Sequence, residues 1–221
     1  AAAANGDFPV NFASDNTAAV APGIMDALLR ANDGFALGYG NDALTRDVEK
    51  RIGELFECDA AVFLVPTGTA ANALSLAQVT PPWGGVLCHE QAHTVAAAIA
   101  RYSGHVPHQV NASALSITQA TEAGTVYRVD EVAAMSEVAH AHGLAVHMDG
   151  ARFANALARM NVTPAEATWK AGVDVLSFGA TKGGAMAAEA VVFFDREQAD
   201  FMPERRKRAG HLLSKHRFLA A

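Results

Sequence analysis

The stretch HMDGARFANAL (147–157), followed after a helical interval by DVLSFGATKGG (174–184), decides the fold. Asp149 comes directly after one short apolar run, and Lys182 follows another such run 33 residues later. Continuous apolar runs of this length are typical of strands buried on both faces of a sheet. Because ligands of open α/β sheets bind at the carboxyl ends of the strands, we expect both side chains at that edge.

A lysine and an aspartate at neighbouring strand ends suit pyridoxal 5'-phosphate (PLP). The lysine amine forms a Schiff base with the cofactor aldehyde, and the carboxylate pairs with the protonated ring nitrogen. Arg152 follows Asp149 by one short turn, and a neighbouring arginine favours an ionised carboxylate. Arg152 donates either to that carboxylate or to the ring hydroxyl. The alternatives are an ordinary surface lysine at position 182 and a structural ion pair at Arg152.

The composition restricts the class of protein. Of the 221 residues, 51% are hydrophobic and 18% are charged, and the net charge is −6. A sizeable core is therefore easily filled, and nucleic acid is not an expected partner. Cys58 and Cys88 do not make a disulfide framework, which favours a reducing, cytoplasmic compartment. No apolar stretch reaches transmembrane length and residues 1–10 lack a signal-peptide pattern, so no membrane partner is expected.

Apolar runs alternate with helical patterns along the chain. Strands are expected at 60–65, 84–89, 114–119, 144–149, 174–179 and 188–195, and helices at 22–32, 43–56, 66–79, 91–104, 131–142 and 153–160. This alternation predicts an α/β fold with three α/β/α layers and a mostly parallel sheet. Ile24, Leu28 and Leu29 are expected to form the apolar face of the first helix, and the basic last 20 residues are expected to be helical.

The predicted organisation has three parts. Residues 1–18 form an N-terminal segment, residues 19–204 form a cofactor-binding large domain, and residues 205–221 form a basic C-terminal segment.

The motif PTGTAAN (66–72) lies between a buried strand and a helix. Backbone N–H groups at a helix N-terminus bind phosphate, and the Thr69 hydroxyl adds a further donor beside Gly68. The alternative is an ordinary N-cap. A cofactor that carries a phosphate favours the first interpretation.

His93 lies just past the strand at 84–89, where an imidazole could stack on a pyridine ring or act as a base. The same segment, HEQAH (89–93), also matches the HExxH signature of zinc peptidases. That signature belongs well inside a helix, whereas His89 ends a strand, and only Glu122 is suitable as a third ligand. The zinc interpretation also leaves the lysine–aspartate arrangement unexplained, so no metal is expected.

The order of these motifs resembles that of the L-threonine aldolases, most closely the low-specificity and phenylserine types. These aldolases are fold-type I PLP enzymes of the aspartate aminotransferase superfamily. The resemblance is carried by SDN (14–16), GYGND (38–42), PTGTAAN (66–72), HEQAH (89–93), TQATEAGTVY (118–127), HMDGARFANAL (147–157), SFGATKGG (177–184) and RRKRAGHLLSK (205–215).

The resemblance implies a role for each matching residue. Lys182 would form the Schiff base, Asp149 would pair with the ring nitrogen and Arg152 with the ring hydroxyl. His93 would stack on the ring, and Gly68 and Thr69 would hold the phosphate. Ser14 would touch the substrate carboxylate, and Tyr39 would lie near the active site, at a subunit boundary. Active sites between subunits of a homotetramer (a dimer of dimers) are implied, with Lys207 and Arg208 contributing to a neighbour's phosphate.

The implied activity is that of a carbon–carbon lyase. It would cleave L-threonine, L-allo-threonine or a related β-hydroxy-α-amino acid such as phenylserine to glycine and an aldehyde. The alternatives are a β-eliminating lyase or an aminotransferase of the same fold, a PLP-binding domain without turnover, and an HExxH zinc hydrolase. Two departures from the family are expected: the C-terminal small domain is absent, and a loop and helix are missing near 103–116, which would make the sheet awkward to pack.

Overall fold

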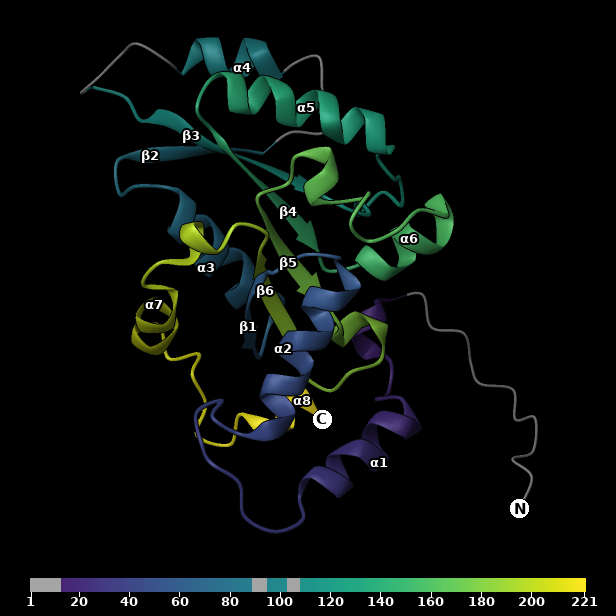
Figure 1. Cartoon of the computed structure of the whole chain (residues 1–221). Helices are drawn as coiled ribbons and strands as arrows, with labels where there is room; N and C mark the ends of the chain where they lie inside the picture. The colour runs from purple at the N-terminus through teal and green to yellow at the C-terminus, as the bar shows by residue number, and fades with distance from the viewer. Residues whose placement is uncertain (1–12, 89–94, 103–107) are drawn as a thin grey trace.

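The computed structural model describes residues 13–88, 95–102 and 108–221. In these ranges the chain forms one six-stranded sheet with helices packed against it, as Figure 1 shows. The layers are helix, sheet and helix, so the predicted three-layer α/β/α architecture is confirmed.

All six predicted strands are present. They are β1 (Ala61–Val65), β2 (Gly84–Cys88), β3 (Asn111–Thr118), β4 (Ala145–Gly150), β5 (Val175–Gly179) and β6 (Glu189–Phe193). Their order in the sheet is β1-β6-β5-β4-β3-β2. The strands from β2 to β5 are parallel, whereas β6 runs antiparallel to both of its neighbours. The last residues of β1 to β5 and the first residue of β6 therefore share one edge.

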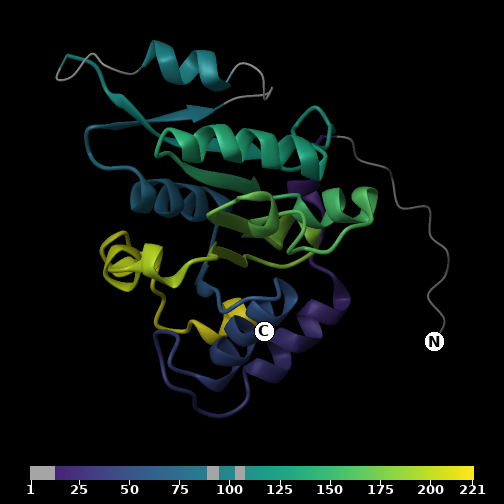
Figure 2. The same cartoon turned by 45° about the horizontal axis from the view of Figure 1, so that its top comes forward.

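Helices cover both faces of the sheet. They are α1 (Pro22–Ala31), α2 (Ala43–Leu55), α3 (Gly68–Val79), α4 (Val95–Arg101), α5 (Val129–Ala141), α6 (Phe153–Met160), α7 (Met202–Arg208) and α8 (Arg217–Ala220). Apolar residues of α3 and α7 share one core cluster, and those of α2, α4, α5 and α6 share the other. Figure 2 shows α8 beside α1 and α2, with which it is in contact.

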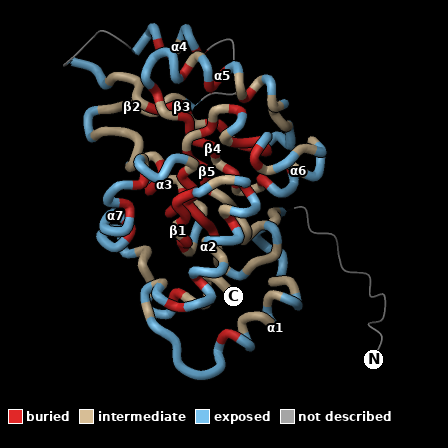
Figure 3. The backbone as a smooth tube through the Cα atoms, viewed as in Figure 1, coloured by how far each residue is buried: buried red, intermediate tan, exposed pale blue. Residues whose placement is uncertain are grey.

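Strand periodicity explains both clusters. Successive strand residues point to opposite faces, so Val62 and Leu64 pack on the α2 side while Ala61 and Val65 pack on the α3 side. Figure 3 shows the buried residues concentrated in the strands. On the α2 side, the fully buried ring of Phe56 meets two other phenylalanine rings edge-on, at centroid distances of 5.5 and 5.4 Å. Each such pair adds about 0.5–1.5 kcal/mol beyond the burial of its area.

The first helix differs from its prediction. Leu29 is 69% exposed, and Ala31 is the residue that α1 buries. Leu29 is exposed because α1 lies at the periphery, where it contacts α8, and does not lie on the sheet. Ile24 and Leu28 are half-buried, so the predicted apolar face is covered in part and Leu29 is its exposed member.

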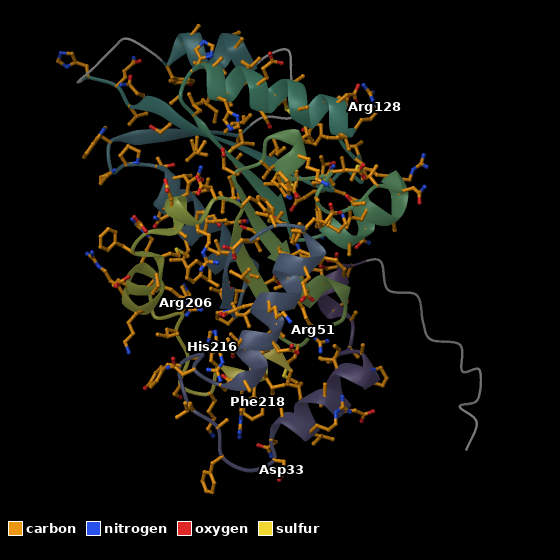
Figure 4. All side chains as sticks on the ribbon, in the orientation of Figure 1. Asp33, Arg51, Arg128, Arg206, His216 and Phe218 are labelled. Atoms are coloured by element: carbon orange, nitrogen blue, oxygen red, sulfur yellow. The ribbon has the colours of Figure 1, made fainter. Side chains whose placement is uncertain are left out.

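The C-terminal segment is less helical than expected, because residues 209–216 separate two short helices. The segment is held by polar contacts of Arg206, which donates to the Leu64 carbonyl at 3.2 Å and lies 3.4 Å from His216 Nε2. Figure 4 shows both side chains close together between α7 and α2. Burial, together with the nearby guanidinium, lowers the pKa of His216 to about 4. The predicted boundary at 204/205 lies inside α7, and the three-part division stays a prediction.

The expected gap near 103–116 does not prevent packing. β2 pairs directly with β3 in parallel, with an irregularity between Gly85 and Val86. β2 is the edge strand of this sheet, and the expectation of an awkward sheet stays a prediction. Within the described ranges, none of the helices combines the length and apolar character that a membrane span requires.

Candidate active site

Lys182 lies on a short turn at the carboxyl edge of the sheet. β5 ends at Gly179, and the 3-10 helix η4 (Thr181–Gly183) begins two residues later. The Thr181 hydroxyl accepts a hydrogen bond from the backbone N–H of Ala188 at 3.2 Å, which closes the loop between β5 and β6. The lysine is half-buried on this turn.

The ends of β4 and β5 approach very closely. A Cβ atom added to Gly179 would lie 2.7 Å from both Cα and the carbonyl oxygen of Ala151. Real Cβ atoms do not approach backbone this closely, so only glycine fits at the end of β5. This approach brings the turn that carries Lys182 against the turn that follows Asp149.

Asp149 is fixed by two hydrogen bonds. Asn72 Nδ2 donates to Asp149 Oδ2 at 2.6 Å, and the backbone N–H of Ala151 donates to Oδ1 at 3.0 Å. Asn72 belongs to α3, one turn beyond its start, and its own Oδ1 is buried without a hydrogen-bond partner. The helix that begins at Gly68 is therefore tied directly to the carboxylate.

A buried histidine, His147, lies two residues before Asp149 on the same strand. His147 Nδ1 is 2.8 Å from Ser116 Oγ, and Nε2 is 3.0 Å from Ser177 Oγ. The side chain is 1% exposed, and burial lowers its pKa to about 4, against the opposing effect of the Asp149 charge. A neutral imidazole thus links β3, β4 and β5 on the face that carries Asp149.

Arg152 pairs with Asp15 and not with Asp149. Nε donates to Asp15 Oδ2 at 2.6 Å, and Nη2 donates to Oδ1 at 3.0 Å. The hydrogen bond from Arg152 is the main cause of the lowered pKa of Asp15, to which the Lys182 charge also contributes. Arg152 thus forms an ion pair, as in the structural alternative considered for this residue. The ion pair holds the segment around Asp15 at the site.

The start of α3 faces the same edge of the sheet. Thr67 is the N-cap, and its hydroxyl accepts from the backbone N–H of Ala70 at 3.1 Å. Gly68 and Thr69 are the first two residues of the helix, so their N–H groups have no partner within it. A helix N-terminus of this kind can bind an anion, and the phosphate site at this motif stays a prediction.

A groove of about 1310 Å³ opens beside Arg152. It runs between the segment at 120–130 and α6, and Val126, Met160 and Val162 contribute apolar surface to its wall. The site therefore adjoins apolar space.

The other residues singled out from the sequence lie in different places. Ser14 caps the 3-10 helix η1 (Asp15–Thr17), which contacts η4. Tyr39 instead has the ammonium of Lys207 4.8 Å from its ring centroid and donates its backbone N–H to Ser214.

His93, with the rest of the HExxH motif at 89–93, lies outside the described residues. Among the residues that are described, no group of three or more His, Cys, Asp or Glu side chains is arranged to hold a metal ion.

Sequence reasoning missed four residues of the site. Asp15 stands next to Ser14 in SDN, and Asn72 is four residues after Gly68, which places it on the same helix face. His147 is two residues before Asp149 in a strand and so shares its face. The fourth residue is Glu189, whose Oε2 lies 3.9 Å from a Cβ added to Gly68, and its signal in the sequence is a lone acidic residue at the start of an apolar strand.

The donor set at this edge suits PLP. It offers a lysine amine, a carboxylate fixed by an amide, and a helix N-terminus that begins with glycine. The buried, unpartnered Asn72 Oδ1 shows that this corner of the site retains hydrogen-bonding capacity.

Comparisons with known proteins agree with this chemistry. The family model described as "Beta-eliminating lyase" matches residues 11–113 and 94–221. A curated relative from Pseudomonas aeruginosa, named low specificity L-threonine aldolase, is 40% identical over 97% of this chain and 70% of its own length. That alignment spans 247 positions, more than the 221 residues of this chain, so it contains gaps in this chain.

Solved structures share the fold. The threonine aldolase of Leishmania major matches with a TM-score of 0.85 and 27% identity, over 94% of this chain and 69% of that one. A putative L-allo-threonine aldolase from Listeria monocytogenes matches with a TM-score of 0.68 and 20% identity, over 97% of this chain and 64% of that one.

Proposed function

This chain belongs to the beta-eliminating lyase family, and we propose from that premise that it is a PLP-dependent carbon–carbon lyase of the threonine aldolase type. Its substrates are L-threonine, L-allo-threonine or related β-hydroxy-α-amino acids, and its products are glycine and an aldehyde. The observation that carries the proposal is the 40% identity to a low specificity L-threonine aldolase over almost the whole chain.

PLP, when bound, supplies an aldehyde that bonds covalently to amines and a ring that withdraws electrons from the bond to be cleaved. Lys182 provides the protein amine for that bond. The Asp149 carboxylate, oriented by Asn72 and the Ala151 N–H, holds the proton on the ring nitrogen. Gly68 and Thr69 at the start of α3 bind the phosphate through their N–H groups.

Arg152 has a divided role in this proposal. Its Nε and Nη2 atoms hold Asp15, which leaves Nη1 to donate to the ring hydroxyl. Ser14, next to Asp15, contacts the substrate carboxylate. By the resemblance to the threonine aldolases, His93 would stack on the ring and would take the proton from the substrate β-hydroxyl. Larger aldehyde side chains find room in the apolar groove beside Arg152.

The protein acts as a homo-oligomer, a dimer of dimers. Support comes from the apolar side chains that α1 and the following loop expose: Leu29 at 69%, Phe35 at 109% and Leu37 at 70%. Exposed apolar patches of this kind mark protein–protein interfaces. Tyr39 and Lys207 lie together on the same part of the surface and reach a neighbouring subunit's site. A Leu29→Glu variant that keeps the wild-type mass in solution by light scattering would contradict this interface.

A reducing, cytoplasmic location is also proposed. Both cysteines are free; Cys58 is partly buried and Cys88 is exposed. An exposed thiol persists where the compartment keeps it reduced. Fractionation of cells that express the protein tests this location.

The central test compares the wild type with Lys182→Ala. The wild type is expected to show a visible absorbance band that borohydride removes, and to release glycine and acetaldehyde from L-threonine. Lys182→Ala is expected to lose both properties. A variant that cleaves threonine at the normal rate contradicts the role of Lys182, and release of ammonia and pyruvate from serine in place of aldol cleavage favours β-elimination.

A further inference from the structure

Glu189 is a buried carboxyl group that the proposed chemistry does not use. It is 7% exposed and is the first residue of β6. In the ladders it pairs with Val65 of β1 on one side and with Gly179 of β5 on the other. Glu189 therefore lies between the strand ends that lead to the α3 N-terminus and to Lys182.

Its side chain points toward the start of α3. A Cβ atom added to Gly68 would lie 3.9 Å from Glu189 Oε2. The strand pattern agrees, because Val65 and Val191 belong to the core cluster on the α3 side. The carboxyl group is thus close to the N–H groups proposed to bind phosphate.

The surroundings of Glu189 contain one cation and one anion. Lys182 on η4 and Asp149 on β4 are the charged groups that act on it, and Thr181 offers its hydroxyl and its backbone N–H. None of the ion pairs in the described ranges includes Glu189. Burial raises the pKa of this carboxyl group, as does Asp149, whereas Thr181 and Lys182 oppose the increase. A second negative charge nearby would raise that pKa further, because like charges disfavour ionisation.

We propose that Glu189 couples binding of a phosphate at the α3 N-terminus to the uptake of one proton. The carboxyl group is ionised while the helix end is free and is neutral once a phosphate monoester occupies it. This inference rests on the proposed function, which places the cofactor phosphate there. Its consequence is that the affinity for the phosphorylated cofactor falls as the pH rises.

The test uses pyridoxamine phosphate, which carries the phosphate but has no aldehyde to bond with Lys182. It is titrated into the cofactor-stripped protein from mildly acidic to mildly alkaline pH. Linkage to one proton weakens wild-type binding by up to about tenfold per pH unit. Glu189→Gln is expected to show a flatter profile and tighter binding than the wild type at alkaline pH. The ligand's own phosphate titrates equally in both proteins, so the difference between them isolates Glu189.

Glu49→Gln is the matched control. Glu49 on α2 is another partly buried glutamate whose pKa burial raises, but its charged neighbours are Arg206, Asp42 and Arg46. Its profile is expected to follow that of the wild type.

Calorimetry of the wild type in two buffers of different ionisation enthalpy counts the protons taken up without any variant. If the complex takes up more protons than the ligand's own groups account for, the coupling is supported. If it takes up no additional protons, the coupling is overturned. Parallel profiles for the wild type and Glu189→Gln overturn the coupling while leaving the proposed function intact. A wild type that binds no pyridoxamine phosphate at any pH overturns both.

Discussion

The buried histidine beneath Asp149 should make folding stability depend on pH. His147 has a pKa of about 4 in the folded chain against an ordinary value of 6.5, because burial disfavours its charged form. Below pH 6.5 the unfolded chain binds a proton that the folded chain does not accept until about pH 4. The contribution of His147 to stability is therefore complete above pH 6.5 and is lost progressively as the pH falls toward 4.

The size of this loss follows from the difference between the two pKa values. Each pKa unit corresponds to about 1.4 kcal/mol, so the loss amounts to about 3 kcal/mol. No reduction for solvent screening is needed because the side chain is 1% exposed. A loss of this size is a large fraction of the about 5–15 kcal/mol by which a typical domain is stable.

The assay is urea denaturation of the wild type and His147→Gln over a series of pH values. Glutamine keeps hydrogen-bonding groups for Ser116 and Ser177 but does not titrate. We expect the variant to be less stable at neutral pH and the gap to shrink by about 3 kcal/mol toward pH 4. The carboxylates titrate in both proteins, so the effect of His147 is read from the difference between their free energies of unfolding. His142→Gln, which removes an exposed histidine, is the control. A gap that stays constant across this pH range would refute the assignment of a buried neutral imidazole.

Three further predictions concern the supports of the site. Asn72→Ala should weaken cofactor binding by about 10- to 100-fold in equilibrium dialysis, since a hydrogen bond to a charged group contributes about 1.5–3 kcal/mol. The melting temperature of this variant should change little, because the substitution also removes a buried oxygen without a hydrogen-bond partner. Gly179→Ala should lower the free energy of unfolding by about 1–3 kcal/mol through overpacking, whereas Gly23→Ala, with no atom within 4 Å of the added Cβ, should not destabilise the chain. A double-mutant cycle on Asp15 and Arg152 should give a coupling of up to about 1 kcal/mol that decreases as salt is added, and a coupling insensitive to salt would contradict a partly exposed ion pair.

Local sequence patterns were sufficient to predict the elements of the fold. Continuous apolar runs mark the strands because a strand covered on both faces has no polar side. The same patterns place Asp149 and Lys182 at strand ends, and ends of parallel strands meet at one edge. The last 20 residues and the Leu29 face were less predictable, because burial there depends on which neighbours cover the segment.

The partners of the site residues depend on contacts between distant parts of the chain. The sequence determined that an amine, a carboxylate and a helix N-terminus lie at one edge of an α/β sheet. Only the tertiary structure decided that Asn72 holds Asp149, that Arg152 turns to Asp15, and that Glu189 lies beside Gly68. The physical reason is strand order: β6 inserts antiparallel between β1 and β5. No local periodicity encodes that choice, because it is made by the packing of the whole sheet.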